Sequence, residues 1–597
     1  MDKPKNFVDM IHNEAYLEPF RKGLITNESL INDYGRRIEL LNGMWSFTID
    51  PYDTCLRGKW WQEEDRDSRG AFVPVDYNFD DWELTSVPSC INLQKPEYFW
   101  YEGPAVYTRE FHYYEEVGRE RVYLKVGAVN YEALIFINRR FVGRHLGGST
   151  PMFVDVTDYL NKEHGNETNR ILIVTNNDRK PTQVPMHNTD WFNYGGLYRD
   201  IGLIRLPKTF IADSSVGLQK GSGFKKIDVS VTVDGPEQSG TAAVEIPELG
   251  IVQTLEVRDG KGTLEIVAEP ELWDTDNPKL YDVMISYATD TLNEKIGFRE
   301  IATSGTEILL NGKSIKLKGI SSHEESVVGG KTMTEAEIRE NFALVKEMNA
   351  NYMRLAHYPH TEKAARIADE VGLLLWEEIP VYWSIAFTNP DTYADAENQL
   401  CEMIKRDKNR ASVIMWSVGN ENADTDERLV FMRKLAEKAK EMDPSRLVSA
   451  ACLWNKDELR IEDRLADSLD VMGINEYFGW YNPHFDDLVT LFENSRSGKP
   501  IVITECGADA PFGEHGTKDQ MWTEEYQENV YIQQVETMRK IDYMAGFSPW
   551  ILYDFRCPRR TNRYQQSFYN RKGLLNPDKT QKKLAFKILR DFYAEWE

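Results

Sequence analysis

Cysteine is scarce in this sequence, and no two cysteines stand close enough to form a short motif. Six occur in 597 residues, at positions 55, 90, 401, 452, 506 and 557. None forms a Cys-x-x-Cys pair, and no histidine cluster has the spacing of zinc ligands. This pattern argues against a disulfide scaffold and against a metal site, and it favours six reduced, buried thiols in a cytoplasmic protein. Cys506 adjoins Glu505 but is interpreted as a packing residue.

Long apolar runs and an excess of positive charge are also absent. No run approaches the roughly 18 apolar residues of a transmembrane helix. The N-terminal stretch MDKPKNFVDMIHNE lacks the apolar core of a signal peptide. The net charge of −25 speaks against nucleic acid or an anionic membrane as the main partner. We therefore expect a soluble cytoplasmic protein that acts on neither.

What the sequence does have is length and many aromatic side chains. A chain of 597 residues is too long for one ordinary domain, so about three domains are expected. Fifteen Trp and 29 Tyr are available to stack on sugar rings, although aromatic residues more often fill the cores of β-sandwiches. No internal repeat and no low-complexity segment is found.

The first third of the chain has the period of β-strands. Within residues 1–205, apolar and polar side chains alternate over 121–126, which predicts a half-buried strand, and no helical period persists. A jelly-roll β-sandwich is predicted there. Within 206–302, valines and isoleucines alternate over 227–233 and stop at the turn pair Asp234–Gly235. This span predicts a smaller, immunoglobulin-like β-sandwich.

From 303 to 597, strand-like runs alternate with helical ones, which predicts βα units and a parallel sheet. One of these helices begins with a capping box, Thr334 to Glu337. Eight strands over this length predict a C-terminal (β/α)8 TIM barrel. The eight predicted strands are Ser314–His323, Ala350–His357, Gly372–Pro380, Ser412–Glu421, Leu447–Trp454, Asp470–Phe478, Pro500–Gly507 and Met544–Asp554.

Two of these strands deliver a glutamate at their C-terminal end. The fourth, in SVIMWSVGNEN, ends in Glu421, and the seventh, in PIVITECG, ends in Glu505. In a TIM barrel that end is the catalytic face, and opposed strands can bring the two carboxyl groups together. A retaining glycosidase needs such a pair about 5–5.5 Å apart. For one glutamate alone, an ion pair or a loop hydrogen bond is an equally good interpretation.

A cationic stretch follows the eighth strand. The window from Phe555 to Pro577 contains no Asp or Glu, in a chain that is otherwise acidic. A cationic loop on the face of the paired carboxylates indicates an anionic group on the substrate. The alternative is a solvated basic loop that pairs with the acidic surface. The six cations of the window are Arg556, Arg559, Arg560, Arg563, Arg571 and Lys572.

Several motifs resemble family 2 of the glycoside hydrolases and, within it, the β-glucuronidases. SVIMWSVGNE resembles the acid/base motif of this family and ITECG its nucleophile motif. LWDTDNP and GFREI resemble its passage from sandwich to barrel. The motifs that resemble its sugar-binding domain are LNGMWSFTID (41–50), WYEGPAVYTREF (100–111), GGSTPMFVDVT (147–157) and DWFNYGGLYRDIGL (190–203).

The resemblance implies a role for each matching residue. Glu421 is implied as the general acid/base, Glu505 as the nucleophile and Asn420 as the group that holds the sugar 2-hydroxyl. Asn570 and Lys572 match the Asn-x-Lys pair with which β-glucuronidases hold the C6 carboxylate. The remaining implied sugar contacts are Asp190, His323, Asn475, Tyr477, Tyr481 and the aromatic platform Trp550.

The sequence departs from these relatives in two places. Gln566 stands where some glucuronidases carry Arg, so the carboxylate clamp is weaker or differently built. Val381–Asn398 lacks the long insertion that closes the site of several relatives, so larger glucuronides and oligosaccharides become plausible substrates. Some relatives without that insertion bind a flavin mononucleotide away from the catalytic site, but the sequence carries no signature for it.

The interpretation is a retaining exo-β-D-glucuronidase that needs no cofactor and that, by resemblance, forms a homo-oligomer, commonly a tetramer. A family 2 β-galacturonidase shares the carboxylate on its substrate and differs at C4. The β-galactosidase alternative does not account for Asn570 and Lys572. The alternative of a non-catalytic carbohydrate-binding homologue does not account for Glu421 and Glu505.

Overall fold

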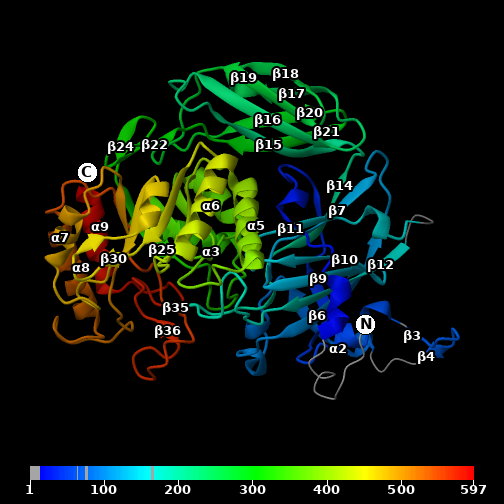
Figure 1. Cartoon of the computed structure of the whole chain (residues 1–597), viewed down its shortest axis with the longest axis horizontal. Helices are drawn as coiled ribbons and strands as arrows, with labels where there is room; N and C mark the ends of the chain where they lie inside the picture. The colour runs from blue at the N-terminus through cyan, green and yellow to red at the C-terminus, as the bar shows by residue number, and fades with distance from the viewer. Residues whose placement is uncertain (1–13, 64, 74–77, 163–166, 597) are drawn as a thin grey trace. The chain divides into compact units, whose positions relative to one another are not determined.

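In a computed structural model, the chain forms two compact units. The structure describes residues 14–63, 65–73, 78–162 and 167–596. The described residues up to Asp178, together with Asn193–Phe210, form the first unit. Arg179–Phe192 and the described residues from Ile211 onward form the second unit (Figure 1).

The first unit is the predicted β-sandwich. The apolar side chains of Val122, Leu124 and Val126 belong to its buried core. The six-stranded sheet has the order β10 (Arg140–Leu146), β9 (Glu132–Ile137), β12 (Glu167–Asn176), β6 (Pro104–Tyr113), β2 (Gly43–Ile49), β5 (Glu83–Val87). The four-stranded sheet has the order β1 (Ile38–Leu40), β14 (Ile201–Leu206), β7 (Arg121–Val126), β11 (Met152–Asp155).

Strand β7 is buried on both faces, so the prediction of a half-buried strand at 121–126 was wrong. Lys125 is 5% exposed. Its ammonium forms an ion pair with Asp33 at 2.5 Å and lies 5.5 Å from the ring centre of Phe153. A buried lysine of this kind is tolerated because a carboxylate compensates for the lost hydration. The alternation of residue types alone did not reveal that partner.

The predicted immunoglobulin-like sandwich is confirmed. In β16 the predicted alternation places Ile227, Val229, Val231 and Val233 in the core. One sheet has the order β15 (Phe210–Leu218), β16 (Lys226–Asp234), β19 (Lys261–Val267). The other has the order β18 (Ile251–Val257), β17 (Gly240–Ile246), β20 (Tyr281–Tyr287), β21 (Asp290–Ile296). A small sheet follows, formed by β22 (Ile301–Ser304), β23 (Glu307–Leu310) and β24 (Lys313–Ile315).

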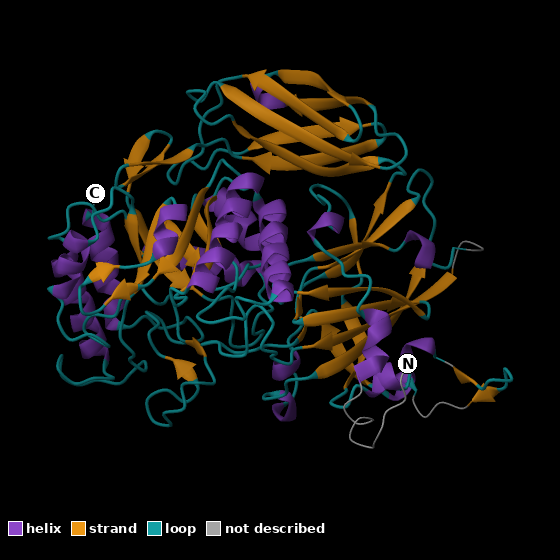
Figure 2. Ribbon diagram, viewed as in Figure 1, coloured by secondary structure: helices purple, strands orange, loops and turns teal. Residues whose placement is uncertain are grey.

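The predicted TIM barrel is also confirmed, and each predicted strand contains one observed barrel strand. All pairings around the barrel are parallel, and Figure 2 shows helices packed outside its strands. The barrel order is β25 (Leu317–Ser322), β26 (Tyr352–Leu355), β27 (Leu374–Glu378), β28 (Val413–Asn420), β29 (Leu447–Cys452), β32 (Val471–Asn475), β33 (Ile501–Glu505), β34 (Gly546–Phe547).

The helices follow the strands, with one departure. The capping box of Thr334 and Glu337 is present at the start of α3. After β29 the described chain forms a hairpin, β30 (Trp454–Asn455) and β31 (Arg460–Ile461), and a 3-10 helix in place of an α-helix. The helices are α3 (Glu335–Glu347), α4 (Glu362–Val371), α5 (Pro390–Asp407), α6 (Asp426–Met442), α7 (Asp487–Asn494), α8 (Glu524–Met538) and α9 (Leu584–Glu595).

The segment 179–192 joins the second unit by binding to α5. The backbone N–H of Val184 donates to Asp395 at 3.2 Å, and the side-chain amide of Gln399 donates to the Val184 carbonyl at 2.8 Å. These bonds satisfy polar backbone groups that burial would otherwise leave unpaired. The segment thereby carries Asp190 to the barrel from far away in the sequence.

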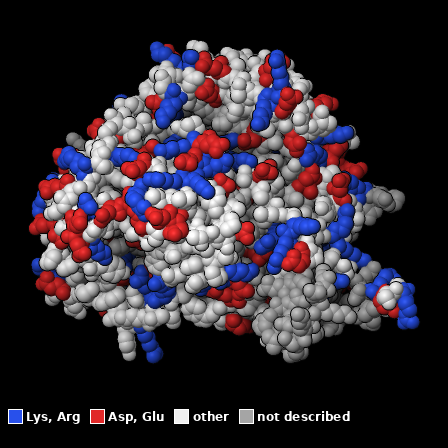
Figure 3. Space-filling model, in the orientation of Figure 1, with Lys and Arg blue, Asp and Glu red and all other residues white. Residues whose placement is uncertain are grey.

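The surface and the thiols agree with the composition. On the face seen in Figure 3, cations and carboxylates are interspersed. All six cysteines are free and buried, as predicted. In the part of the chain that the structure describes, no helix is both long enough and apolar enough to cross a membrane.

Candidate active site

Glu421 and Glu505 line one cavity at the C-terminal ends of the barrel strands. Glu505 is the last residue of β33, and Glu421 follows the last residue of β28. Glu421 has a positive φ of 53°, a left-handed conformation that does not continue the extended strand. The cavity has a volume of about 310 Å³. The tertiary structure thus brings together two carboxyl groups that lie 84 positions apart in the sequence (505 − 421).

Glu505 is held by two directed donors. The guanidinium of Arg354 donates to one carboxylate oxygen at 2.9 Å, and the hydroxyl of Tyr477 donates to the other at 2.7 Å. Burial raises the pKa of Glu505 to about 7; Arg354 opposes this rise, and nearby Glu421 adds to it. Electrostatic coupling between the two carboxyl groups is the condition under which one stays protonated while the other ionises.

Arg354 is the centre of a buried network that the sequence analysis missed. This arginine is fully buried. It donates to both oxygens of Glu378, at 3.2 and 2.9 Å, and to the amide oxygen of Asn420 at 2.9 Å. Burial alone would raise the pKa of Glu378, but Arg354 and His357 outweigh it and hold the pKa below its usual value. The available signal was charge inside two apolar strands: one arginine in NYMRLAH and two adjacent glutamates in LLLWEEI.

Glu421 has a less polar environment than Glu505. The indole N–H of Trp383 donates to its carboxylate at 2.9 Å. Burial raises the pKa of Glu421, and this indole bond only partly opposes the rise. A raised pKa is what a carboxyl group needs to donate a proton near neutral pH. Trp383 was not predicted from the sequence.

Asn420 and Asn475 are hydrogen-bonded to each other next to Glu421. The side-chain amide of Asn475 donates to the Asn420 oxygen at 3.1 Å, and Thr504 donates to the Asn475 oxygen at 2.7 Å. The amide nitrogen of Asn420 lies 3.5 Å from Glu421. These bonds fix both amides in one orientation.

Lys572 and Tyr481 form one wall of the cavity. The Lys572 ammonium is buried, forms an ion pair with Asp509 at 2.6 Å and lies 3.3 Å from the Tyr481 hydroxyl. Partial desolvation alone would raise the pKa of Tyr481, but Lys572 and Arg560 outweigh it and lower the pKa. Two cations therefore act on the same hydroxyl group.

Asn570 lies behind Lys572. Its amide oxygen accepts the backbone N–H of Lys572 at 3.1 Å. Its amide nitrogen is buried and has no hydrogen-bond partner among the residues that the structure describes. An unpaired buried donor is costly, so this N–H group stands out among the polar groups near Lys572.

Arg560 is a second cation of the cavity wall that the sequence analysis did not single out. Its guanidinium forms an ion pair with Asp190 at 2.6 Å, and the Cys557 thiol donates to the other oxygen of Asp190 at 3.2 Å. Burial opposes the charge on Arg560, but Asp190 outweighs it and raises the pKa of the guanidinium. The sequence feature that could have indicated Arg560 is its position in the cationic stretch after the eighth strand.

Most of that stretch is paired rather than solvated. Arg556 contacts Glu325 at 3.5 Å, and Arg571 contacts Asp554 at 3.4 Å. With Lys572 and Arg560, four of the six cations therefore have a carboxylate partner from outside the stretch.

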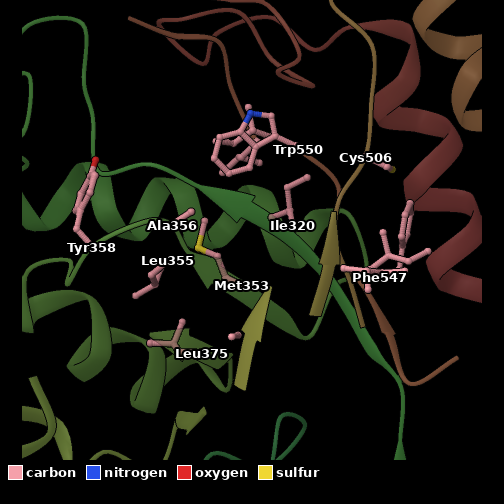
Figure 4. Close-up of a cluster of buried hydrophobic side chains, with 14 of the residues drawn as sticks. Ile320, Met353, Leu355, Ala356, Tyr358, Leu375, Cys506, Phe547 and Trp550 are labelled. Atoms are coloured by element: carbon pink, nitrogen blue, oxygen red, sulfur yellow. The ribbon is translucent and has the colours of Figure 1, made fainter. Parts of the chain in front are cut away.

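Trp550 lines the cavity within an aromatic cluster. It is 3% exposed. Its ring stacks on His357 with centres 4.9 Å apart and meets His323 edge-on at 5.3 Å. Figure 4 shows Trp550 in the same apolar cluster as Ile320 and Met353.

Three predicted contact residues do not line the cavity as described: His323, Asn420 and Asn570. His323 bonds to the Tyr358 hydroxyl at 3.1 Å, and burial holds the pKa of its imidazole well below the usual value. The predicted residues that do line it are Asp190, Glu421, Asn475, Tyr477, Tyr481, Glu505, Trp550 and Lys572. Among the described residues, no group of three or more His, Cys, Asp or Glu could hold a metal ion.

Comparison with known proteins places this architecture in one family. Family models match residues 38–207 (glycosyl hydrolases family 2, sugar binding domain), 210–299 (glycosyl hydrolases family 2) and 301–596 (glycosyl hydrolases family 2, TIM barrel domain). The chain is 29% identical to the β-glucuronidase of Paenibacillus borealis, over 94% of this chain and 97% of that protein.

Solved structures are similar over nearly the whole chain. A β-glucuronidase from Ruminococcus gnavus in complex with D-glucaro-δ-lactam has a TM-score of 0.82 and 26% identity, covering 95% of this chain and 100% of that one. A β-galacturonidase from Eisenbergiella tayi shares the fold, with a TM-score of 0.79 and 24% identity over 94% of this chain and 98% of that one. The resemblance seen in the motifs is thereby confirmed, and the chain belongs to family 2 of the glycosyl hydrolases.

Proposed function

We propose that the protein is a retaining exo-β-D-glucuronidase, which hydrolyses β-D-glucuronides to glucuronate and an alcohol. The observation that carries the proposal is one cavity that holds both carboxyl groups, Glu421 and Glu505, together with two cations, Lys572 and Arg560. The similarity to β-glucuronidases over the whole chain supports it.

The reaction proceeds by double displacement. Glu505 attacks C1 of the sugar and forms a covalent glycosyl ester, while Glu421 gives its proton to the departing glycosidic oxygen. Glu421, now ionised, then takes a proton from water as the water oxygen attacks C1. The ester bond breaks, Glu505 is released as a carboxylate, and the sugar leaves as the β-anomer.

The C6 carboxylate binds at the Tyr481 hydroxyl, where Lys572 and Arg560 both act. In the free enzyme Asp509 and Asp190 hold these cations in position, at 2.6 Å in each case. The cations are therefore placed before the substrate arrives, which reduces the entropy cost of binding. The unpaired N–H of Asn570 supplies a further donor. Arg560 takes the part left open by Gln566.

The other predicted residues contact the sugar hydroxyls or its ring. We assign the 2-hydroxyl to Asn420, further hydroxyl contacts to Asp190, Asn475 and Tyr477, and an outer role to His323. The apolar face of the sugar packs on Trp550, because ring C–H groups favour an aromatic surface. Residues beyond Glu421 receive the aglycone, so we name two parts: the sugar half, around Glu505 and Lys572, and the leaving-group half, around Glu421.

Further properties follow from the same proposal. The short segment 381–398 leaves the mouth open to oligosaccharide glucuronides as well as small ones. The enzyme needs no cofactor, works in the cytoplasm and assembles into a homo-oligomer. Its domains span 1–205, 206–302 and 303–597.

A panel of aryl glycosides tests the proposal. The purified protein should hydrolyse an aryl β-D-glucuronide with a much higher kcat/KM than the matching galacturonide, galactoside or glucoside. Preference for the galacturonide would assign the enzyme to the other uronic acid, and no turnover of any of the four would favour a binding protein. Proton NMR of the first product, before mutarotation, should show the β-anomer; early α-anomer would exclude double displacement.

A further inference from the structure

Two tryptophans, Trp383 and Trp454, line the cavity together with Glu421. The indole of Trp383 donates to the Glu421 carboxylate at 2.9 Å. The backbone N–H of Glu421 donates to the Ala451 carbonyl at 3.0 Å, and the chain runs from there to Trp454. The cavity thus has a tryptophan from each of these two loops in its lining. Because Glu421 protonates the glycosidic oxygen, the group attached to that oxygen lies against these rings.

Trp454 is held in a fixed position. Its indole N–H donates to the Asn475 carbonyl at 2.9 Å, and its ring packs on Phe478 with centres 5.6 Å apart. The side chain of Asn455 accepts the backbone N–H of Asp457 at 2.9 Å, which closes the turn of the β30–β31 hairpin. The hairpin thus presents a rigid apolar surface to an incoming ring.

A cationic side chain lies over the ring of each tryptophan. The ammonium of Lys456 lies 6.0 Å from the ring centre of Trp454, and the guanidinium of Arg559 lies 4.6 Å from that of Trp383. Both side chains are exposed, and Lys456 also lines the cavity. A cation over an aromatic face keeps its full charge, because the ring has no charge of its own.

Neither cation is neutralised by a carboxylate. Over the described ranges, Lys456 and Arg559 form no ion pair. The hairpin acids Glu458 and Glu462 are instead bound by Arg460, at 2.9 and 3.1 Å. This differs from the sugar half, where Arg354, Lys572 and Arg560 each have an aspartate or glutamate partner. One of these unpaired cations lines the cavity and the other lies over a tryptophan that lines it, which is unexpected in a chain with a net charge of −25.

We infer that the leaving-group half is a subsite for an aglycone that carries a carboxylate or sulfate on a ring with an apolar face. The ring packs on Trp454 or Trp383, and its anionic group meets Lys456 and Arg559. The inference rests on the proposed glucuronidase activity and names the substrate class of the same site. Two sources share this chemistry: an acidic sugar that continues an oligosaccharide, and an aryl alcohol with an anionic substituent.

The test compares two aryl glucuronides, 4-methylumbelliferyl and 3-carboxyumbelliferyl, on the wild type, Lys456→Ala, Arg559→Ala and the double variant. The quantity is the ratio of kcat/KM for the anionic over the neutral aglycone. Leaving-group acidity is the same for every variant, so it cancels when ratios are compared. Each single substitution should lower the ratio about two- to fivefold, as for an exposed ion pair. The double variant should approach the product of the two effects, and added salt should reduce the wild-type ratio.

Lys434→Ala is the matched control. Lys434 is also an exposed cation over an aromatic ring, 5.4 Å from the centre of Tyr393, but it does not line the cavity. Its substitution should leave the ratio unchanged. The inference is overturned if the ratio is the same in the wild type and the double variant. This includes the case in which kcat/KM falls by the same factor for both substrates. Failure of the proposed function itself is distinguishable, because then the wild type would hydrolyse neither glucuronide.

A pair of disaccharides separates the two sources. Glucuronic acid β-linked to a sulfated or carboxylated sugar is compared with glucuronic acid linked to the neutral sugar, on the same four proteins. A larger loss for the acidic disaccharide than for the carboxyumbelliferyl substrate identifies an oligosaccharide as the ligand. A larger loss for the aryl substrate identifies an anionic aryl alcohol. No loss with either pair excludes both.

Discussion

The two halves of the cavity hold their charges in different ways. In the sugar half, Arg354 binds Glu378 and Glu505, and Lys572 binds Asp509, all with almost no exposure to solvent. In the leaving-group half, Glu421 is bound by a neutral indole, and the cations lie exposed over aromatic rings.

The difference teaches which half is rigid. A buried ion pair tolerates little displacement, because separating its charges away from water is costly. An exposed cation over a ring can move at small cost. We therefore expect the sugar half to accept one kind of sugar and the leaving-group half to accept a range of aglycones.

The largest expected effect comes from removing each carboxyl group. Glu505→Ala should abolish turnover with every leaving group, because no covalent intermediate can form. Glu421→Ala should lose about 10²- to 10⁴-fold with poor leaving groups. It should lose much less with an activated phenol, which departs without protonation.

Rates across a series of leaving groups of graded acidity would measure this contrast. A steeper dependence on leaving-group acidity is expected for Glu421→Ala than for the wild type. Equal losses in both variants across the whole series would contradict the assignment of acid and nucleophile.

The second effect concerns the paired cations of the sugar half. Lys572→Ala and Arg560→Gln should each reduce the preference for glucuronide over glucoside about ten- to a hundredfold, since a hydrogen bond to a charged group contributes about 1.5–3 kcal/mol. Asn570→Ala should reduce it less. The ratio of kcat/KM for the two sugars is the measurement, because damage to the shared carboxyl groups cancels in it.

Arg563→Gln is the control for this experiment. Arg563 lies in the same loop, is exposed and does not line the cavity. If Arg560→Gln lowers kcat/KM by the same factor for the glucuronide and the glucoside, Arg560 acts by orienting Asp190 and does not bind the C6 carboxylate. If Lys572→Ala leaves the preference intact, the proposed carboxylate site is wrong.

A third effect concerns the hydroxyl group that donates to Glu505. The nucleophile must be ionised, so kcat/KM falls as pH drops through its raised pKa. The Tyr477 hydroxyl stabilises the ionised form, and its removal raises the pKa. Tyr477→Phe should therefore move the acidic limb of the pH profile upward by about one to two units. Tyr526→Phe, which removes a hydroxyl bonded to the Gly479 carbonyl, should leave that limb in place.

The smallest effect is expected in the leaving-group half. Glu421 must be protonated, so kcat/KM falls as pH rises through its raised pKa. The Trp383 indole stabilises the ionised form, and Trp383→Phe should raise this pKa further. The basic limb should move upward by at most about one unit, since the donor is neutral. A shift of the acidic limb instead would reverse the two roles.

Much of the fold was predictable because the sequence repeats its local signals. Apolar runs such as those around Trp416 and Val502 are buried on both faces, which is typical of parallel strands, and turn residues separate them. The capping box at Thr334 marked one helix start. The connection after β29 was not predicted as a hairpin, because its 3-10 helix and turn depend on bonds made by single side chains such as Asn455.

The candidate site divides in the same way. The sequence by itself determined that Glu421 and Glu505 stand at strand ends, because strand length and alternation are local properties. Only the tertiary structure decided that Asp190 meets Arg560, that Arg354 bonds to Glu505, and that Lys572 is paired with Asp509. These contacts join residues that are far apart in the chain. The attraction between two charges depends on their distance in space, so a local sequence pattern does not reveal which residues pair.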